Sequence, residues 1–213
     1  GRVQNADIVV TNKVVLNKDI LEKSNIKLIC VIATGTNNID LEYAKQRGIE
    51  VRNVVGYAKA TVAQLTFTFA LHFIQKLDYY KKYVEDKKWE KSDIFTNLDE
   101  PFYELENKNW GIIGLGNIGR RVANIAKAFE CNVNYHSTSK KNLNTEYNHM
   151  ELEELLKTSD IISIHSPLNE STHNLINSTN LSMLKDGAIL INVGRGGIIN
   201  EKDLAKALDE EKN

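Results

Sequence analysis

The amino-acid sequence predicts an α/β protein built from two doubly wound parallel sheets. Short apolar runs alternate with amphipathic segments along most of the chain, which is the pattern of strands joined by crossover helices. One of these runs, residues 27–33 (KLICVIA), is almost continuously apolar, as expected for a parallel strand that is buried on both faces. The length of 213 residues is enough for one large domain or two small ones.

The first part of the chain predicts a β-α-β-α-β unit. The predicted elements are strands at residues 8–10, 27–33 and 49–53, and helices at residues 18–24 and 41–47. Asn17 and Asp40 are suitable N-caps for the two helices, and Gly48 is a suitable residue after the second one. We therefore expect a small doubly wound sheet at the start of the chain.

Residues 61–83 predict one long helix, because apolar side chains recur there at intervals close to 3.6 residues. We interpret it as a core helix, with an interdomain hinge helix as the alternative. The stretch 85–100 is charged and contains turn-forming residues, so it predicts a domain junction. The expected domains are residues 1–84, which include the hinge helix, and residues 85–213.

The alternation of strands and helices begins again after this junction. The predicted elements are strands at residues 110–115, 132–136, 160–165 and 188–193, and helices at residues 117–129, 150–157 and 179–184, with a last helix that Asn200 caps. Four strands would make an incomplete sheet of the doubly wound type. The chain also begins without Met and stops inside a charged helical pattern, so we expect both ends to be cut or unobserved.

Composition excludes several classes of protein. With 27 basic and 28 acidic residues the net charge is −1, which argues against a nucleic-acid binder. No apolar run is long enough to span a membrane, and the first residues lack the layout of a signal peptide. The only cysteines, Cys30 and Cys131, argue against a disulfide scaffold and favour the reducing cytoplasm. Histidines and cysteines do not cluster with metal-ligand spacing, so we expect no metal site.

The strongest motif is GLGNIG, residues 114–119, which follows the apolar run WGIIGL and opens a predicted helix. In this context Gly114 permits a tight turn, Gly116 lets a pyrophosphate approach the backbone, and Gly119 lets the helix pack close to the strand. Backbone N–H groups near Asn117 and Ile118 and the helix dipole would then hold the phosphates. A tight turn without any ligand is the alternative.

Three other positions follow predicted strands at the edge where doubly wound sheets bind ligands. Arg195 lies among glycines in NVGRGG and can clamp a carboxylate with two hydrogen bonds, although a solvated surface loop is the alternative. Thr34 and Gly35 can form an anion-binding loop, or a simple turn. His165 ends the strand DIISIH, and we favour a structural or cofactor-neighbouring role over proton transfer.

Five ordered motifs together resemble the D-isomer-specific 2-hydroxyacid dehydrogenases. They are ATGTNNID (33–40), NVVGYAKATVAQ (53–64), WGIIGLGNIG (110–119), IHSPLNESTHNLIN (164–177) and LKDGAILINVGRGGIINE (184–201). The resemblance covers nearly the whole chain. The pairing of ATGTNN with VAQ is most similar to the glycerate dehydrogenase branch, the hydroxypyruvate and glyoxylate reductases.

The resemblance implies a flavodoxin-like substrate domain, a Rossmann nucleotide domain, and an active site in the cleft between them. Arg195 matches the catalytic arginine that binds the substrate carboxylate and polarises its carbonyl. Thr34 and Gly35 match the loop that holds this carboxylate, and Tyr57 lies near the pocket. The positions that match cofactor contacts are Gly114, Gly116, Asn117, Ile118, Gly119, Ser137, His165, Pro167, Val193 and Gly194.

The implied reaction is hydride transfer between NAD or NADP and a small 2-keto or 2-hydroxy acid, in a homodimeric enzyme. The family's catalytic histidine and the glutamate that orients it are expected beyond Asn213. The family also often shows a histidine where Leu65 stands here. The alternative function is a nicotinamide-nucleotide-sensing binding module of the same fold, similar to the C-terminal-binding corepressors.

The choice between NAD and NADP depends on the end of the second strand of the nucleotide domain. The family pattern places the ribose-binding acidic residue at Ser137, and no Asp or Glu lies between Glu130 and Glu146. The segment Ser137 to Lys141 instead supplies hydroxyl groups and two lysines, which suit a 2′-phosphate. We therefore predict that NADP is accepted, with a solvated polar turn without cofactor preference as the alternative.

Overall fold

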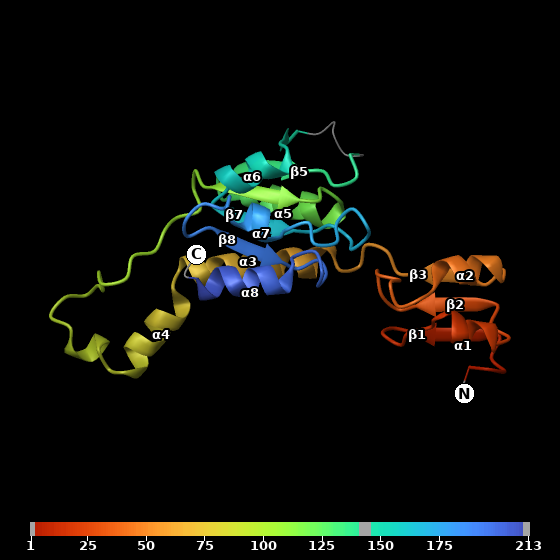
Figure 1. Ribbon diagram of the computed structural model, residues 1–213. Helices are drawn as coiled ribbons and strands as arrows, with labels where there is room; N and C mark the ends of the chain where they lie inside the picture. Colours follow the sequence, from red (N-terminus) through yellow and green to blue (C-terminus); the bar gives the residue numbers. More distant parts are fainter. Residues whose placement is uncertain (1–2, 141–145, 211–213) are drawn as a thin grey trace. The chain divides into compact units, whose positions relative to one another are not determined.

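The computed structural model describes residues 3–140 and 146–210 (Figure 1). The chain forms two compact units, unit 1 (Gly1–Ala58) and unit 2 (Lys59–Asn213). This division lies before the long helical segment, whereas the sequence suggested a boundary after residue 84. The reason is that the first half of that segment contributes Ala63, Phe67 and Ala70 to the core of unit 2.

Unit 1 contains a three-stranded parallel sheet and two short helices. The sheet has the order β1-β2-β3, and the elements are β1 (Ile8–Thr11), α1 (Lys18–Glu22), β2 (Leu28–Val31), α2 (Leu41–Gln46) and β3 (Glu50–Asn53). The side chain of Asn17 accepts a hydrogen bond from the Ile20 amide, and that of Asp40 accepts one from the Tyr43 amide. Both predicted N-caps are therefore confirmed.

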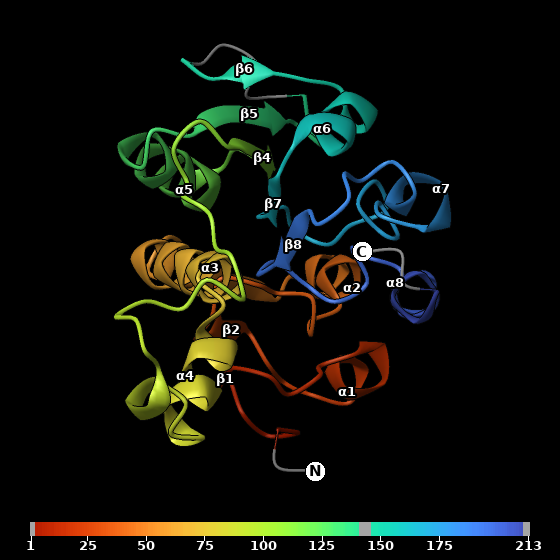
Figure 2. The same cartoon turned by 90° about the vertical axis from the view of Figure 1, so that its left-hand side faces the viewer.

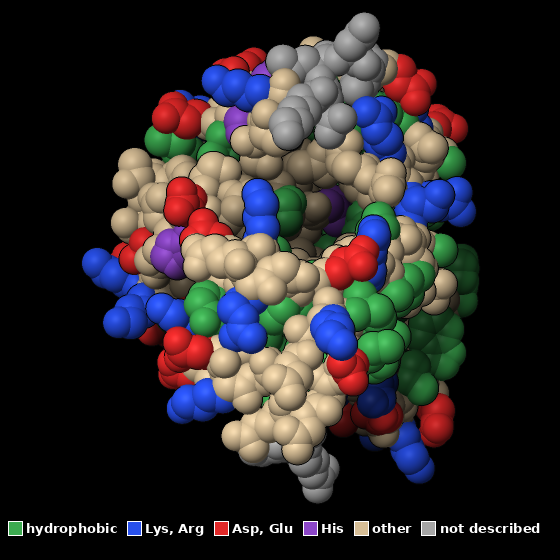
Figure 3. All heavy atoms as spheres, turned by 90° about the vertical axis from the view of Figure 1, so that its right-hand side faces the viewer, with side chains coloured by type: hydrophobic (Ala, Val, Ile, Leu, Met, Phe, Trp, Pro, Cys, Tyr) green, Lys and Arg blue, Asp and Glu red, His purple; other side chains and the backbone are tan. Residues whose placement is uncertain are grey.

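Only one face of the unit 1 sheet is covered by helices within residues 3–58. Leu21 of α1 and Ala44 of α2 share one core with Ile29 and Val31 of β2. The alternate residues of the sheet point to the other face, where Ile8 and other apolar side chains are exposed. Figure 3 shows hydrophobic side chains gathered on this side of the unit. A doubly wound sheet would have both faces covered, so the described part of unit 1 has only half of that arrangement.

The predicted long helix over residues 61–83 is wrong as a single element. The structure has α3 (Lys59–Ile74) and α4 (Leu77–Glu85), and Lys76 between them adopts a left-handed conformation with φ 51°. A residue in that conformation ends the regular series of helical hydrogen bonds. α3 packs into the core of unit 2, whereas α4 has no buried residue. A short 3₁₀ helix, η1 (Trp89–Lys91), follows.

Unit 2 is built on a five-stranded parallel sheet of order β6-β5-β4-β7-β8. Its strands are β4 (Asn109–Ile113), β5 (Asn132–His136), β6 (Asn148–His149), β7 (Ile161–Ile164) and β8 (Ile189–Asn192). β6 was not predicted, because two polar residues carry no apolar pattern. The strand order reverses between β4 and β7, and such a switch point is where doubly wound sheets bind ligands.

Helices cover both faces of the unit 2 sheet (Figure 2). Besides α3, they are α5 (Asn117–Ala128), α6 (Leu152–Thr158), α7 (Ser178–Leu181) and α8 (Glu201–Asp209). α3 and α5 enclose one core around Trp110 and Ile112, and α6 to α8 pack over a second core around Ile113 and Ile162. Alternate residues of β4 thus point into different cores. This confirms the predicted parallel α/β fold, and it fixes the carboxyl ends of the strands along one edge.

Candidate cofactor-binding site

The turn between β4 and α5 requires glycine at two positions. Gly114 has φ +96°, and a Cβ there would lie 2.4 Å from Ser166 Oγ and 2.9 Å from the Ser166 amide nitrogen. A Cβ on Gly119 would lie 2.2 Å from the carbonyl oxygen of Gly114. The first glycine therefore permits the turn, and the third permits the close approach of α5 to the turn.

Gly116 differs from these two glycines, because no atom lies within 4 Å of the Cβ position it would have. It is the N-cap of α5, and no side chain caps the helix at this end. The first N–H groups of a helix have no partner within the helix, and they attract anions. The open backbone at Gly116, Asn117 and Ile118 therefore fits the pyrophosphate of a dinucleotide, which an added Cβ would obstruct.

The end of β5 lies directly beside this turn, since the Gly114 amide donates a hydrogen bond of 2.9 Å to the His136 carbonyl. Ser137, the predicted ribose-binding position, follows it but is only 3% exposed. Thr138 Oγ1 lies 3.3 Å from Ser166 Oγ. The side chain of Lys140 is exposed, and Lys141 lies outside the described residues.

His165 follows β7 and belongs to a short polar line inside the sheet. Trp110 Nε1–H donates a hydrogen bond of 2.9 Å to Ser163 Oγ, and this oxygen lies 3.0 Å from His165 Nε2. The buried Nδ1 atom has no hydrogen-bond partner in the described part of the chain. Burial lowers the pKa of His165 to about 4, so the ring is neutral at pH 7. A neutral, partly buried ring agrees with a structural or cofactor-neighbouring role. Pro167 lies exposed two residues further on.

Arg195 lies in an ordered loop after β8 that also contains Val193 and Gly194. Asn192 Oδ1 accepts a hydrogen bond of 3.0 Å from the Gly194 amide, and Asn192 Nδ2 donates one of 2.9 Å to the Arg195 carbonyl. Among the residues that the structure describes, the exposed guanidinium of Arg195 donates only to the neighbouring Gly194 carbonyl. It forms no ion pair with any described residue, so it is available to an anionic ligand.

The predicted substrate-binding residues Thr34, Gly35 and Tyr57 belong to unit 1. Thr34 follows the end of β2, where its hydroxyl donates to the Val54 carbonyl (3.1 Å) and its carbonyl accepts from Asn53 Nδ2 (2.6 Å). These bonds join the loops after β2 and β3, and they leave the Thr34 side chain exposed. Tyr57 is also exposed, in the segment before α3.

Sequence reasoning missed Ser166, which contacts the turn at Gly114 and the segment at Thr138. The residue is 3% exposed although it follows a strand at the ligand-facing edge. A small polar residue directly after a buried strand is a weak signal, because many turns contain serine. Only the packing against Gly114 distinguishes it.

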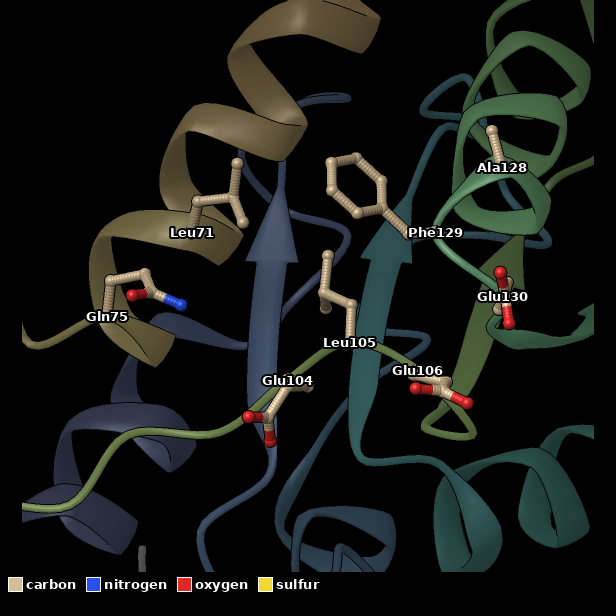
Figure 4. A pocket seen from close by; sticks show the side chains of 8 residues that line it. All are labelled: Leu71, Gln75, Glu104, Leu105, Glu106, Ala128, Phe129 and Glu130. Atoms are coloured by element: carbon tan, nitrogen blue, oxygen red, sulfur yellow. The ribbon is translucent and has the colours of Figure 1, made fainter.

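The structure also contains a groove of about 340 Å³ at the opposite edge of unit 2, where β4 begins (Figure 4). Leu71, Leu105 and Phe129 form its apolar floor, and Glu104, Glu106 and Glu130 carry carboxylates around it. This groove is separate from the glycine-rich turn and is not the candidate site.

No group of three or more His, Cys, Asp or Glu side chains is arranged to hold a metal ion in residues 3–140 and 146–210. Within the same ranges, none of the helices combines the length and the apolar character that crossing a bilayer requires.

Residues 67–213 match the family described as "D-isomer specific 2-hydroxyacid dehydrogenase, NAD binding domain". A hydroxypyruvate reductase from Blautia hydrogenotrophica is 38% identical over all of this chain and 67% of its own length. A glyoxylate reductase from Thermococcus litoralis is 36% identical over 94% of this chain and 62% of its own length.

Solved structures give the same result. A D-lactate dehydrogenase from Aquifex aeolicus, complexed with NAD and lactic acid, superposes with a TM-score of 0.87 and 32% identity. The match covers 98% of this chain and 62% of that one. An acyclic imino acid reductase in complex with NADPH and D-Arg has a TM-score of 0.88 and 31% identity, covering 97% and 66%. The chain thus spans about two thirds of the length of these proteins.

Proposed function

Because the chain belongs to the D-isomer-specific 2-hydroxyacid dehydrogenase family, we propose that it is part of a nicotinamide-dependent oxidoreductase acting on a small 2-keto or 2-hydroxy acid. The observation that carries this proposal is the turn after β4. Gly114 and Gly119 are required by packing there, whereas Gly116 faces open space at an uncapped helix N-terminus. A turn that only joined a strand to a helix would not need a glycine at position 116, where a side chain would meet no other atom.

In this proposal the bound cofactor supplies or accepts the hydride at its nicotinamide ring. Arg195 binds the substrate carboxylate and polarises the carbonyl, because its guanidinium is permanently charged and free of carboxylate partners among the described residues. Thr34 and Gly35 hold the same carboxylate through their loop, with Tyr57 nearby. His165 does not donate the proton, since its pKa of about 4 leaves it unprotonated at neutral pH.

The proposed substrates are glyoxylate and hydroxypyruvate. The similar proteins named as reductases of these two acids support this choice. The test is a turnover assay of the full-length protein with glyoxylate, hydroxypyruvate and pyruvate. Reduction of either of the first two acids is the expected result. Tight cofactor binding without turnover of any 2-keto acid would instead favour a nucleotide-sensing binding module.

We propose that NADP is accepted as well as NAD. The absence of a carboxylate from residues 131–145 supports this, because a carboxylate at the end of β5 would repel a 2′-phosphate. The exposed side chain of Lys140 adds a cation to the same segment. Burial of Ser137 means that a 2′-phosphate would reach its hydroxyl only after a local rearrangement.

We also propose that the protein is a cytoplasmic homodimer. Its two cysteines are free thiols, which fits a reducing compartment.

The segment 77–103 of unit 2 exposes many large apolar side chains, with Phe95 at 92% and Leu98 at 77% exposure. Figure 1 shows this segment, with α4, extending from the end of α3. Apolar surface of this extent is typical of a contact with another chain. Sedimentation of the full-length protein and of a Phe95→Asp variant tests the homodimer. We expect the variant to dissociate more readily, and a monomeric wild type would contradict the proposal.

A further inference from the structure

We propose that Ser166 is a positioning residue, which holds the loop after β5 against the phosphate-binding turn and thereby strengthens the binding of the dinucleotide. The proposal rests on the proposed function, because the ligand is the cofactor of that activity. Ser166 is only 3% exposed, so we assign it an indirect role rather than a contact with the ligand. It acts through Thr138, the residue that follows Ser137 after β5.

The first observation is how closely Ser166 packs against the turn. Its Oγ atom lies 2.4 Å, and its amide nitrogen 2.9 Å, from the position that a Cβ on Gly114 would occupy. The carbonyl oxygen of Ser166 lies 3.0 Å from the corresponding position on Gly194. One small residue therefore separates the turn after β4 from the loop that carries Arg195.

The second observation is the direction of the hydrogen bonds around Ser166. Its Oγ lies 3.3 Å from the Ile113 carbonyl oxygen and 3.3 Å from Thr138 Oγ1. A serine hydroxyl has one hydrogen, and a carbonyl oxygen can only accept. Both contacts are hydrogen bonds only if Ser166 donates to Ile113 and Thr138 donates to Ser166. Thr138, two residues after the end of β5, is thus linked through Ser166 to Ile113, the last residue of β4.

The third observation is a second serine in a similar environment at the other end of β7. Ser159 Oγ lies 2.4 Å from the Cβ position of Gly111 and donates 2.7 Å to the Leu155 carbonyl. Both serines are buried, and each packs against a glycine of β4 or its turn. Ser159 lies where β7 begins, and among the described residues its hydroxyl bonds to the Leu155 carbonyl of α6 rather than to Thr138. It is therefore a matched control for the loss of a buried serine hydroxyl.

The experiment measures dinucleotide binding by the full-length protein and four variants. They are Ser166→Ala, Thr138→Val, the double variant and Ser159→Ala, each titrated with NADH, NADPH and ADP-ribose. We expect Ser166→Ala to weaken binding of all three ligands about fivefold, the equivalent of one neutral hydrogen bond. The double variant should bind no more weakly than Thr138→Val alone, because both changes remove the same contact. Ser159→Ala should bind as wild type.

Activity gives a second readout. The KM for the dinucleotide should rise in Ser166→Ala while kcat changes by less than about twofold, because only binding is affected. Additive losses in the double variant would overturn the proposal, and so would equal losses in Ser166→Ala and Ser159→Ala. A wild-type protein that binds no dinucleotide would refute the proposed function itself. Wild-type binding with an unaffected Ser166→Ala variant would refute only the positioning role.

Discussion

Replacing Gly116 by alanine should separate cofactor binding from folding. The Cβ added at this position meets no atom within 4 Å, and the backbone at φ −81° and ψ −162° is extended, which alanine tolerates. Alanine is a poorer N-cap than glycine, but it also restricts the unfolded chain, so the free energy of unfolding should stay within about 1 kcal/mol of wild type. The same Cβ would stand in the open space that the pyrophosphate needs. Loss of one hydrogen bond to a charged phosphate costs about 1.5–3 kcal/mol, so affinity should fall about ten- to hundred-fold.

Gly119→Ala is the matched control for this prediction. Its Cβ would lie 2.2 Å from the Gly114 carbonyl oxygen and 3.2 Å from Ile112 Cγ2, so the helix or the turn must shift. Overpacking of this kind costs about 1–3 kcal/mol of stability, and binding should be lost with it. The assays are urea denaturation and equilibrium titration with NADH. A Gly116→Ala protein that binds NADH within about threefold of wild type (about 0.7 kcal/mol) would refute the reasoning, as would one as unstable as Gly119→Ala.

Three further predictions concern the other loops of the site. Arg195→Lys should cost about 2–4 kcal/mol of transition-state stabilisation, measured as a lower kcat/KM for a 2-keto acid, because lysine loses the two-pronged geometry of the guanidinium. A fall in kcat/KM of less than about threefold would contradict the role of Arg195. Ser137→Asp should shift the ratio of kcat/KM for NADPH and NADH toward NADH, and an unchanged ratio would count against the proposed ribose site. Burial depresses the pKa of His165 to about 4, so the stability that the neutral ring contributes is complete above pH 6.5 and falls by up to about 3 kcal/mol as the pH drops through 4. Urea denaturation between pH 7 and 4 should show this fall in wild type and less of it in His165→Gln.

The sequence by itself determined the elements that depend on local chemistry. Asn17, Asp40 and Asn200 cap helices as predicted. In each case a side-chain oxygen accepts a hydrogen bond from a backbone amide three residues later, so the interaction is local in sequence. The glycine-rich turn between β4 and α5 was predicted for the same reason, since three glycines at fixed spacing reflect local backbone needs. The parallel α/β class followed from the alternation of apolar runs and amphipathic helices.

Other features were decided only by tertiary structure, because they arise between residues far apart in the chain. The two-residue strand β6 exists through its pairing with β5 rather than through its own pattern. The helical periodicity of residues 61–83 continues across Lys76, yet the chain turns there, since α3 is held in the core of unit 2 and α4 is not. Ser166 acquires its place through contacts with Gly114 and Thr138, which no spacing in the sequence brings together. Local rules predict which segments form, and long-range packing decides which side chains meet.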